Sequence, residues 1–178
     1  KITRSGLFSA LLKPPHQMDD EACQRAARSI GTVRVEAERL RRSGGKLLIV
    51  SEENMMGSMR GNLATSRLYP GLAERLTRFA LAFDGACSRI CLVVRPYEDY
   101  WSSSLAYAVH AGSPLPDEDK LDWLVTQPRS WRRVITDVSE AFPGADIRVW
   151  RFDRLIGRPA RQFAALAGDY ARNAFRPF

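Results

Sequence analysis

An arginine and a serine, eight residues apart, could together hold a phosphate group. Arg95 follows the apolar run Arg89–Val94, and Ser103 lies further along the chain, within an expected helix at residues 98–110. The apolar run has the character of a buried strand. A guanidinium at the strand end and a hydroxyl two turns into the helix could bind a phosphate from two sides, by charge and by hydrogen bond.

The same residues also permit an ordinary structural interpretation. Arg95 could pair with Glu98 or Asp99, which lie where the first turn of a helix favours acidic side chains. The small serines at residues 102–104 could simply pack between helix and sheet. On the local pattern alone, the structural interpretation is favoured over phosphate binding.

Two carboxylates follow a second apolar run. Residues 46–51 are expected to form a buried strand, and Glu52 and Glu53 come directly after it. A carboxylate in this place could act as a general base that removes a proton from a hydroxyl or amine. Adjacent residues at a strand end point to opposite sides, so only one is expected to face a site. Alternatively, both could cap the next turn or pair with Arg60 or Arg67.

The elements that must position these groups follow an alternating pattern. Strands are expected at residues 46–51, Arg89–Val94 and Asp146–Arg151. Helices are expected at residues 21–29, 33–42, 70–83, 98–110, 130–142 and Pro159–Ala167. Strands that alternate with helices predict an α/β fold with a parallel sheet flanked by helices, and a chain of 178 residues suits one domain over residues 1–178. In such sheets, binding sites lie beyond the carboxyl ends of the strands.

The segment around Arg95 resembles a motif of a known family. In the P-loop sulfotransferases an Arg ends a strand, an acid follows four residues later, and a Ser follows eight residues later. Here Arg95, Asp99 and Ser103 stand in that register after the strand residues 90–94. The resemblance implies that Arg95 and Ser103 bind the 3′-phosphate of the sulfate donor, 3′-phosphoadenosine-5′-phosphosulfate (PAPS).

A second stretch is similar to the same family. Residues 149–155, followed by Pro159 and its helix, match the family's strand, acidic turn and proline-led helix, and Asp153 falls among the acids that hold the turn. The two motifs cover about half of the chain. They imply a P-loop NTPase-like sheet and transfer of a sulfuryl group from PAPS to a hydroxyl or amine of a small-molecule or glycan acceptor. Some members of the family use a Glu as the base, which here would be Glu52 or Glu53.

The family's 5′-phosphosulfate loop is not found in this sequence. That loop is a Gly-rich turn with a Lys and a Ser or Thr, but within residues 1–15 Gly6 stands alone and Lys13 is followed by two prolines. The family's basic, Gly-containing loop near the C-terminus is also not evident before Phe178. We therefore expect that the domain is truncated at its N-terminus and that the chain lacks a group required for catalysis.

Composition narrows the class of protein only slightly. The net charge of +7 favours anionic partners, whether nucleotides, nucleic acids or sulfated substrates. The apolar runs are far shorter than the ~20 residues of a membrane-spanning helix. The three cysteines and two histidines form no metal-binding pattern, and sulfuryl transfer needs no metal. Reduced cysteines suit a cytoplasmic location.

Three other functions remain open at this stage. The chain could be a non-catalytic relative that keeps the sulfotransferase scaffold for binding. It could bind nucleic acid through the aromatic and basic residues 131–133 and 150–151, although these fall in elements expected to be packed. It could also be a P-loop kinase with Glu52, Glu53 or Asp153 as the Mg²⁺-binding acid, which the spacing of Arg95 and Ser103 disfavours. The acceptor and the oligomeric state are not encoded in any recognisable motif.

Overall fold

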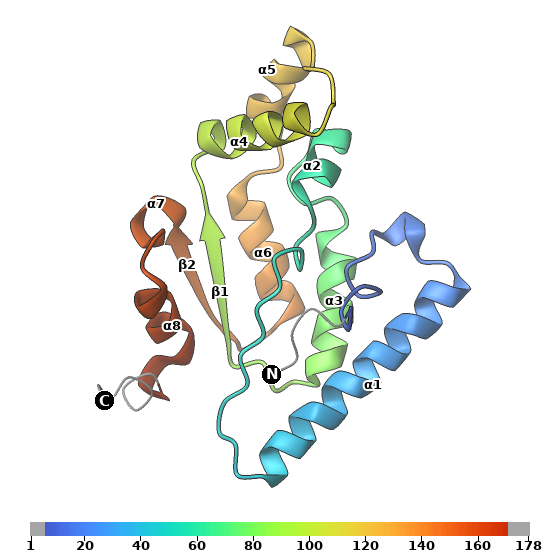
Figure 1. Cartoon of the computed structure of the whole chain (residues 1–178), viewed down its shortest axis with the longest axis vertical. Coiled ribbons are helices and arrows are strands. Elements are labelled where there is room, and N and C mark those ends of the chain that lie inside the picture. The colour runs from blue at the N-terminus through green and yellow to red at the C-terminus, as the bar shows by residue number, and fades with distance from the viewer. Residues whose placement is uncertain (1–5, 171–178) are drawn as a thin grey trace.

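Two of the three expected strands form a parallel sheet. The structure, a computed structural model, describes residues 6–170, and within them β1 (Arg89–Val94) pairs with β2 (Asp146–Arg151). The bounds of both strands and their parallel direction are as predicted. The register sets Val94 opposite Arg151, so the two strands end at the same level (Figure 1). Residues 1–5 and 171–178, which belong to the stretches where the family's phosphate-binding loops are not evident in the sequence, lie outside the described residues.

The other elements are helical, and most lie where the sequence predicts them. They are η1 (Pro15–Gln17), α1 (Asp20–Arg42), α2 (Met59–Thr65), α3 (Leu72–Phe83), α4 (Tyr97–His110), α5 (Glu118–Thr126), α6 (Trp131–Ala141), α7 (Phe152–Leu155), α8 (Pro159–Ala167) and η2 (Gly168–Tyr170). The two helices expected at residues 21–29 and 33–42 are one continuous helix, α1. Gly31 lies inside it, because a single glycine costs a helix only about 1 kcal/mol and does not end it. None of the described helices is long and apolar enough to span a bilayer.

The prediction of a third strand at residues 46–51 is wrong for the described structure. The segment connects α1 to α2 without regular secondary structure, and its backbone makes no hydrogen bond to another described residue. Leu47 and Leu48 are 37% and 49% exposed. An apolar run becomes a strand only where a neighbouring strand satisfies its backbone groups, and here a cleft separates the segment from β1. The sheet within residues 6–170 has two strands, so its parallel α/β character is established but a P-loop NTPase-like topology is not.

The sheet lies between two layers of helices. Cys91 of β1 faces α8, where its Sγ lies 3.9 Å from the carbonyl oxygen of Ala165. Leu92 points to the opposite side, because successive strand residues alternate, and is buried in the main core with α3 and α6. α1 packs on the outer side of α3 (Figure 1). The largest fully buried apolar side chains are Phe79, Leu11, Leu68, Leu72, Leu124 and Val134.

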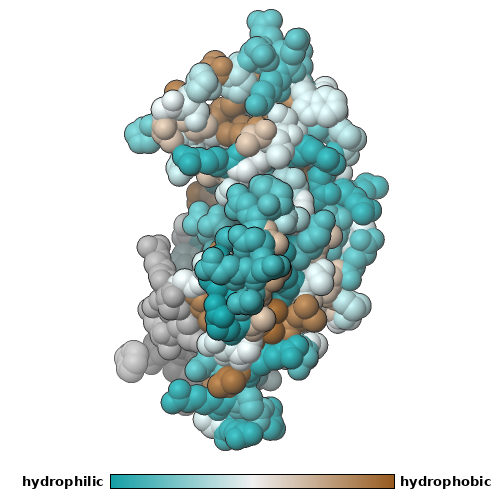
Figure 2. Space-filling model, turned by 90° about the vertical axis from the view of Figure 1, so that its right-hand side faces the viewer, coloured by the Kyte–Doolittle hydropathy of each residue, from teal (hydrophilic) through white to brown (hydrophobic). Residues whose placement is uncertain are grey.

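The exposed side of α1 is strongly charged. The face of the molecule on the α1 side is largely hydrophilic, with hydrophobic residues in small patches (Figure 2). Glu38 accepts hydrogen bonds from Arg41 at 2.7 Å and from Arg42 at 2.8 Å. These two guanidinium groups lower the pKa of Glu38 to about 2. Because these pairs are exposed, they favour solubility more than stability.

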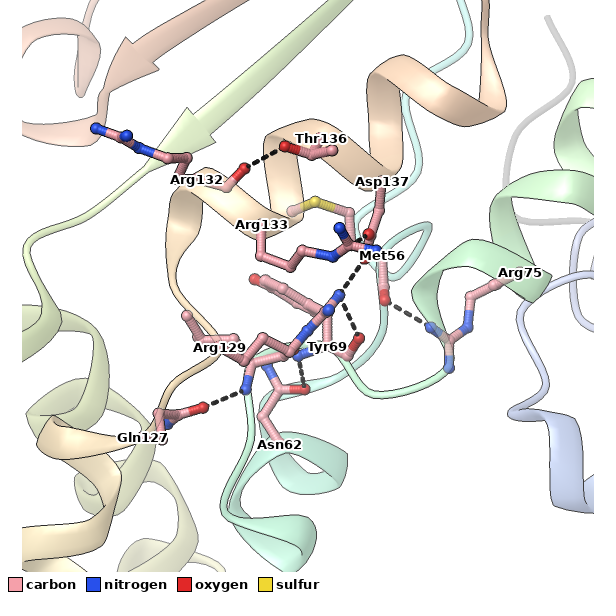
Figure 3. Close-up of polar contacts among 11 residues, drawn as sticks. Met56, Asn62, Tyr69, Arg75, Gln127, Arg129, Arg132, Arg133, Thr136 and Asp137 are labelled. Atoms are coloured by element: carbon pink, nitrogen blue, oxygen red, sulfur yellow. Dashed lines mark hydrogen bonds and ion pairs between the residues drawn. The ribbon is translucent and has the colours of Figure 1, made fainter.

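A buried ion pair connects α6 to the loop before α3 (Figure 3). Asp137 is 4% exposed, accepts a hydrogen bond from Arg129 and forms an ion pair with Arg133, whose Nε lies 3.1 Å from Oδ1 of Asp137. Arg129 also donates to the backbone carbonyls of Leu68 and Tyr69. The Arg129 guanidinium therefore joins the loop before α3 to Asp137 of α6.

Replacing Asp137 by alanine is expected to destabilise the protein severely. The Asp137→Ala variant leaves the largely buried Arg129 guanidinium without its counter-charge, which typically costs about 3–5 kcal/mol of unfolding free energy. Glu36→Ala, which removes the exposed ion pair with Arg39 on α1, should change the unfolding free energy by less than about 1 kcal/mol. Urea denaturation measures both, and similar losses in the two variants would contradict a structural role for the Arg129–Asp137 pair.

Candidate functional site

Arg95 and Ser103 meet at the carboxyl end of β1. Arg95 directly follows the last residue of the strand, and Pro96 leads into α4, on which Ser103 lies. Nη1 of Arg95 donates a hydrogen bond to Oγ of Ser103 over 3.3 Å. Both side chains retain contact with solvent. The convergence expected from their spacing is therefore present.

Phe152 is a third member of the site that the sequence reasoning missed. The Arg95 guanidinium lies over the Phe152 ring, with its central carbon 3.6 Å from the ring centroid. Phe152 directly follows β2 and begins α7, just as Arg95 directly follows β1. Because β1 and β2 are parallel neighbours, the residue after β2 lies beside the residue after β1. That equivalence could have identified Phe152 from the sequence. Arg95 is thus held by Ser103 and Phe152, not by the Glu98 or Asp99 ion pair of the structural interpretation.

The start of α4 is fastened to α6, which fixes the direction in which Arg95 leaves the sheet. The backbone N–H of Trp131 donates to the Tyr97 hydroxyl over 2.7 Å. The Tyr100 N–H donates to the Pro96 carbonyl over 2.9 Å and so closes the first turn of α4. The first contact fixes the connection from β1 to α4 against α6, and the second fixes it to the first turn of α4.

Three aromatic residues form a wall beside Arg95. The rings of Tyr69, Tyr100 and Trp131 lie 5.6–6.2 Å apart, centroid to centroid. Burial, above all, and the neighbouring Tyr100 raise the pKa of Tyr69 well above its ordinary value, whereas the positive charge of Arg95 acts in the opposite direction. Tyr69 therefore remains a neutral phenol. Trp131 packs against both tyrosines in this cluster.

The site opens into a large cleft along β1. We define the β1 cleft as the space of about 1320 Å³ between β1 and residues 46–56, with Arg95 and Ser103 among its lining residues. The aromatic wall of Tyr69, Tyr100 and Trp131 also lines it. A cleft of this size is large enough for a nucleotide-sized ligand.

Glu52 and Glu53 line the same cleft as Arg95 and Ser103. The Glu52 carboxylate accepts the backbone N–H of Asn54 over 3.0 Å, which is the turn-capping role considered as its alternative. Glu53 is exposed, and no ion pair with Arg60 or Arg67 is found for either acid in the described part of the chain.

The acidic segment is held in place from α3. Nη1 of the buried Arg75 donates to the Met56 carbonyl over 2.6 Å (Figure 3). Gly57 follows with a φ of 133°, a conformation that strongly favours glycine, and a Cβ there would lie 3.3 Å from the same Arg75 nitrogen. Arg75 thereby fixes the end of the segment that carries Glu52 and Glu53.

Asp153 has the contacts of a residue that stabilises the turn after β2. Its carboxylate accepts hydrogen bonds from Nε and Nη2 of Arg151, both over 3.1 Å. The Arg151 guanidinium holds the pKa of Asp153 below its usual range.

No cysteine of the three takes part in a disulfide, and burial raises the pKa of Cys87 and of Cys91, so both thiols are neutral near pH 7. No cluster of three His, Cys, Asp or Glu side chains suited to a metal ion occurs among residues 6–170.

Comparison of the chain with protein-family models, curated proteins and solved structures finds no match.

The contact between Arg95 and Phe152 is expected to appear as an energetic coupling. A cation held over an aromatic ring at a partly exposed site contributes about 0.5–1 kcal/mol. A double-mutant cycle of Arg95→Ala and Phe152→Ala, measured by urea denaturation, should yield a coupling of that size. A cycle of Phe152→Ala with Arg28→Ala on α1 serves as the control, and its effects should add within about 0.3–0.5 kcal/mol. Additive effects in the first cycle as well would contradict the site geometry.

Proposed function

We propose that this chain binds the sulfate donor PAPS, or its product adenosine 3′,5′-bisphosphate, as the 3′-phosphate-binding part of a sulfotransferase. The observation that carries the proposal is the pairing of Arg95 with Ser103 at the tip of β1, on the wall of a nucleotide-sized cleft. A P-loop NTPase-like arrangement of the complete domain belongs to the same proposal.

The pair has the chemistry that a terminal phosphate requires. A guanidinium presents parallel N–H donors to phosphate oxygens, and a hydroxyl adds a neutral donor from a second direction. Phe152 restricts the Arg95 side chain before any ligand binds, so less conformational entropy is lost on binding. The present hydrogen bond between Arg95 and Ser103 would be exchanged for bonds from both residues to the phosphate.

The proposed reaction moves a sulfuryl group to a small-molecule or glycan acceptor. The acceptor oxygen or nitrogen attacks sulfur, the bond from sulfur to the bridging phosphate oxygen breaks, and adenosine 3′,5′-bisphosphate leaves. A carboxylate takes the acceptor's proton. Glu53 suits this role better than Glu52, whose carboxylate is engaged with the Asn54 N–H.

Catalysis needs one more group than the described residues supply. Charge that develops on the phosphosulfate requires a preorganised cation and backbone donors, and residues 1–15 contain no Gly-rich loop that could supply them. We therefore expect donor binding by the chain itself and no turnover. A non-catalytic scaffold that uses the same fold is the second candidate.

Adenosine 3′,5′-bisphosphate is expected to raise the melting temperature of the chain. At a hundredfold excess over Kd, binding stabilises by about 2.7 kcal/mol, which for a domain of this size is a rise of roughly 5–10 °C. Arg95→Ala and Ser103→Ala should abolish or strongly reduce the rise, because each removes a phosphate contact. Arg28→Ala, which removes the same charge from the surface of α1, should keep it. Differential scanning fluorimetry measures all four proteins.

A comparison of ligands sharpens the test. Adenosine 5′-monophosphate lacks the 3′-phosphate, so it should stabilise the wild-type chain less than the bisphosphate does and should not distinguish wild type from Arg95→Ala. No rise at millimolar bisphosphate in a chain shown to be folded would overturn donor binding and leave the scaffold. If Arg28→Ala lost as much of the rise in melting temperature as Arg95→Ala does, the bisphosphate would be responding to net charge alone and not to a site at Arg95.

A further inference from the structure

Hydrogen-bond donors outnumber acceptors at the tip of β1. Nη1 of Arg95 donates to Oγ of Ser103 over 3.3 Å, so Ser103 accepts that bond and keeps its own hydroxyl hydrogen. A helical serine often donates this hydrogen to the carbonyl four residues earlier, as Ser104 does to Tyr100 over 2.8 Å. Ser103 makes no such bond to another described residue, so its hydrogen is available to a ligand.

The Asn62 amide fixes the direction of hydrogen bonding at Tyr100. The backbone N–H of Tyr69 can only donate, and it bonds to Oδ1 of Asn62 over 3.0 Å (Figure 3). The other end of the same amide, Nδ2, can also only donate, and it lies 2.5 Å from the Tyr100 hydroxyl oxygen. The Tyr100 oxygen therefore accepts from Asn62, and the hydrogen of this hydroxyl points elsewhere.

Tyr69 does not accept that hydrogen. After burial, the neighbouring Tyr100 is what raises the pKa of Tyr69, in part through a hydrogen bond between the two phenols. A hydrogen bond raises the pKa of an acid when the acid is its donor, so Tyr69 donates and Tyr100 accepts. The two side chains are only 8% and 5% exposed, and both line the β1 cleft. The Tyr100 hydrogen thus has no acceptor among the described residues and turns to the cleft.

The backbone of Tyr69 is strained at this point. Its φ is 45°, a left-handed value that is rare for a bulky side chain. Ser66 and Asp84, the other described non-glycine residues with positive φ, end α2 and α3, where this conformation is common. Tyr69 ends no helix, and its conformation is held by Asn62 on its N–H and by Arg129 on its C=O. Strain that is held in this way is typical of ligand sites.

The three groups with available donors lie together. Tyr100 and Ser103 are three residues apart on α4 and so lie on the same side of it, and Arg95 contacts Ser103. No carboxylate pairs with Arg95 in the described part of the chain. A backbone carbonyl would satisfy one of these donors and leave the positive charge unpaired. An oxyanion would satisfy the charge and the hydroxyls at once.

We propose that the Tyr100 hydroxyl is a third donor to the phosphate that Arg95 and Ser103 bind, and that the site therefore selects a terminal phosphate monoester over a phosphodiester. A monoester offers three terminal oxygens, one for each donor group, whereas a diester offers two. The inference rests on the proposed function for its ligand, adenosine 3′,5′-bisphosphate, and adds to it a binding residue and a selectivity.

Removal of the Tyr100 hydroxyl tests the assignment. Tyr100→Phe keeps the ring and should weaken binding of adenosine 3′,5′-bisphosphate by about tenfold or more, because a hydrogen bond to a charged group is lost. Tyr69→Phe is the matched control. It removes the hydroxyl of the adjacent phenol but leaves the Tyr100 donor in place, so the affinity should change by less than about threefold. Isothermal titration calorimetry measures Kd, and circular dichroism establishes that each variant is folded.

A modified ligand separates a hydrogen bond to the phosphate from an effect on packing. Methylation of the 3′-phosphate converts the monoester into a diester and leaves the adenosine and the 5′-phosphate unchanged. The wild-type chain should bind the methyl ester at least about tenfold more weakly. In Tyr100→Phe the loss caused by methylation should be at least about threefold smaller, since the donor is already missing. Altered packing alone would lower the affinity for both ligands in the same proportion.

The possible results distinguish this inference from the proposed function. Equal affinity for the bisphosphate in wild type and Tyr100→Phe would overturn the inference and leave the proposed function intact, and so would an equal loss in Tyr69→Phe. Equal binding of the bisphosphate and its methyl ester by the wild-type chain would overturn it without the need for any variant to fold. No binding of the bisphosphate by the folded wild-type chain would overturn the proposed function and this inference with it.

Discussion

The parallel pairing of β1 with β2 is the constraint on which the candidate site depends. The ladder sets Val94 opposite Arg151, so the next residue of each strand, Arg95 and Phe152, emerges at the same edge. A shift of the register by one residue would turn every side chain of one strand to the other face and would separate the guanidinium from the ring. The stacking of Arg95 on Phe152 therefore depends on the backbone hydrogen bonds that pair β1 with β2.

Buried arginines attach the irregular segments around the cleft to its helical walls. Arg75 holds the Met56 carbonyl from α3, and Arg129 holds the carbonyls of Leu68 and Tyr69 while paired with Asp137 of α6. Each guanidinium provides several donors in a fixed plane, which suits it to satisfying loop carbonyls that no helix or sheet can reach. Burial lowers the pKa of Arg75, yet the carbonyls it contacts favour the charged form that these bonds require.

Local sequence patterns predicted the elements whose structure is decided locally. Arg89–Val94 and Asp146–Arg151 are apolar runs preceded by glycine-containing turns, and both are strands with the predicted bounds. Residues 46–51 show the same pattern but do not form a strand. Strand formation depends on a neighbouring backbone, and the local sequence does not specify whether one is present. Ser103 was found from its spacing along one strand–helix unit. Phe152 was missed because its contact with Arg95 depends on the pairing of two strands about fifty residues apart.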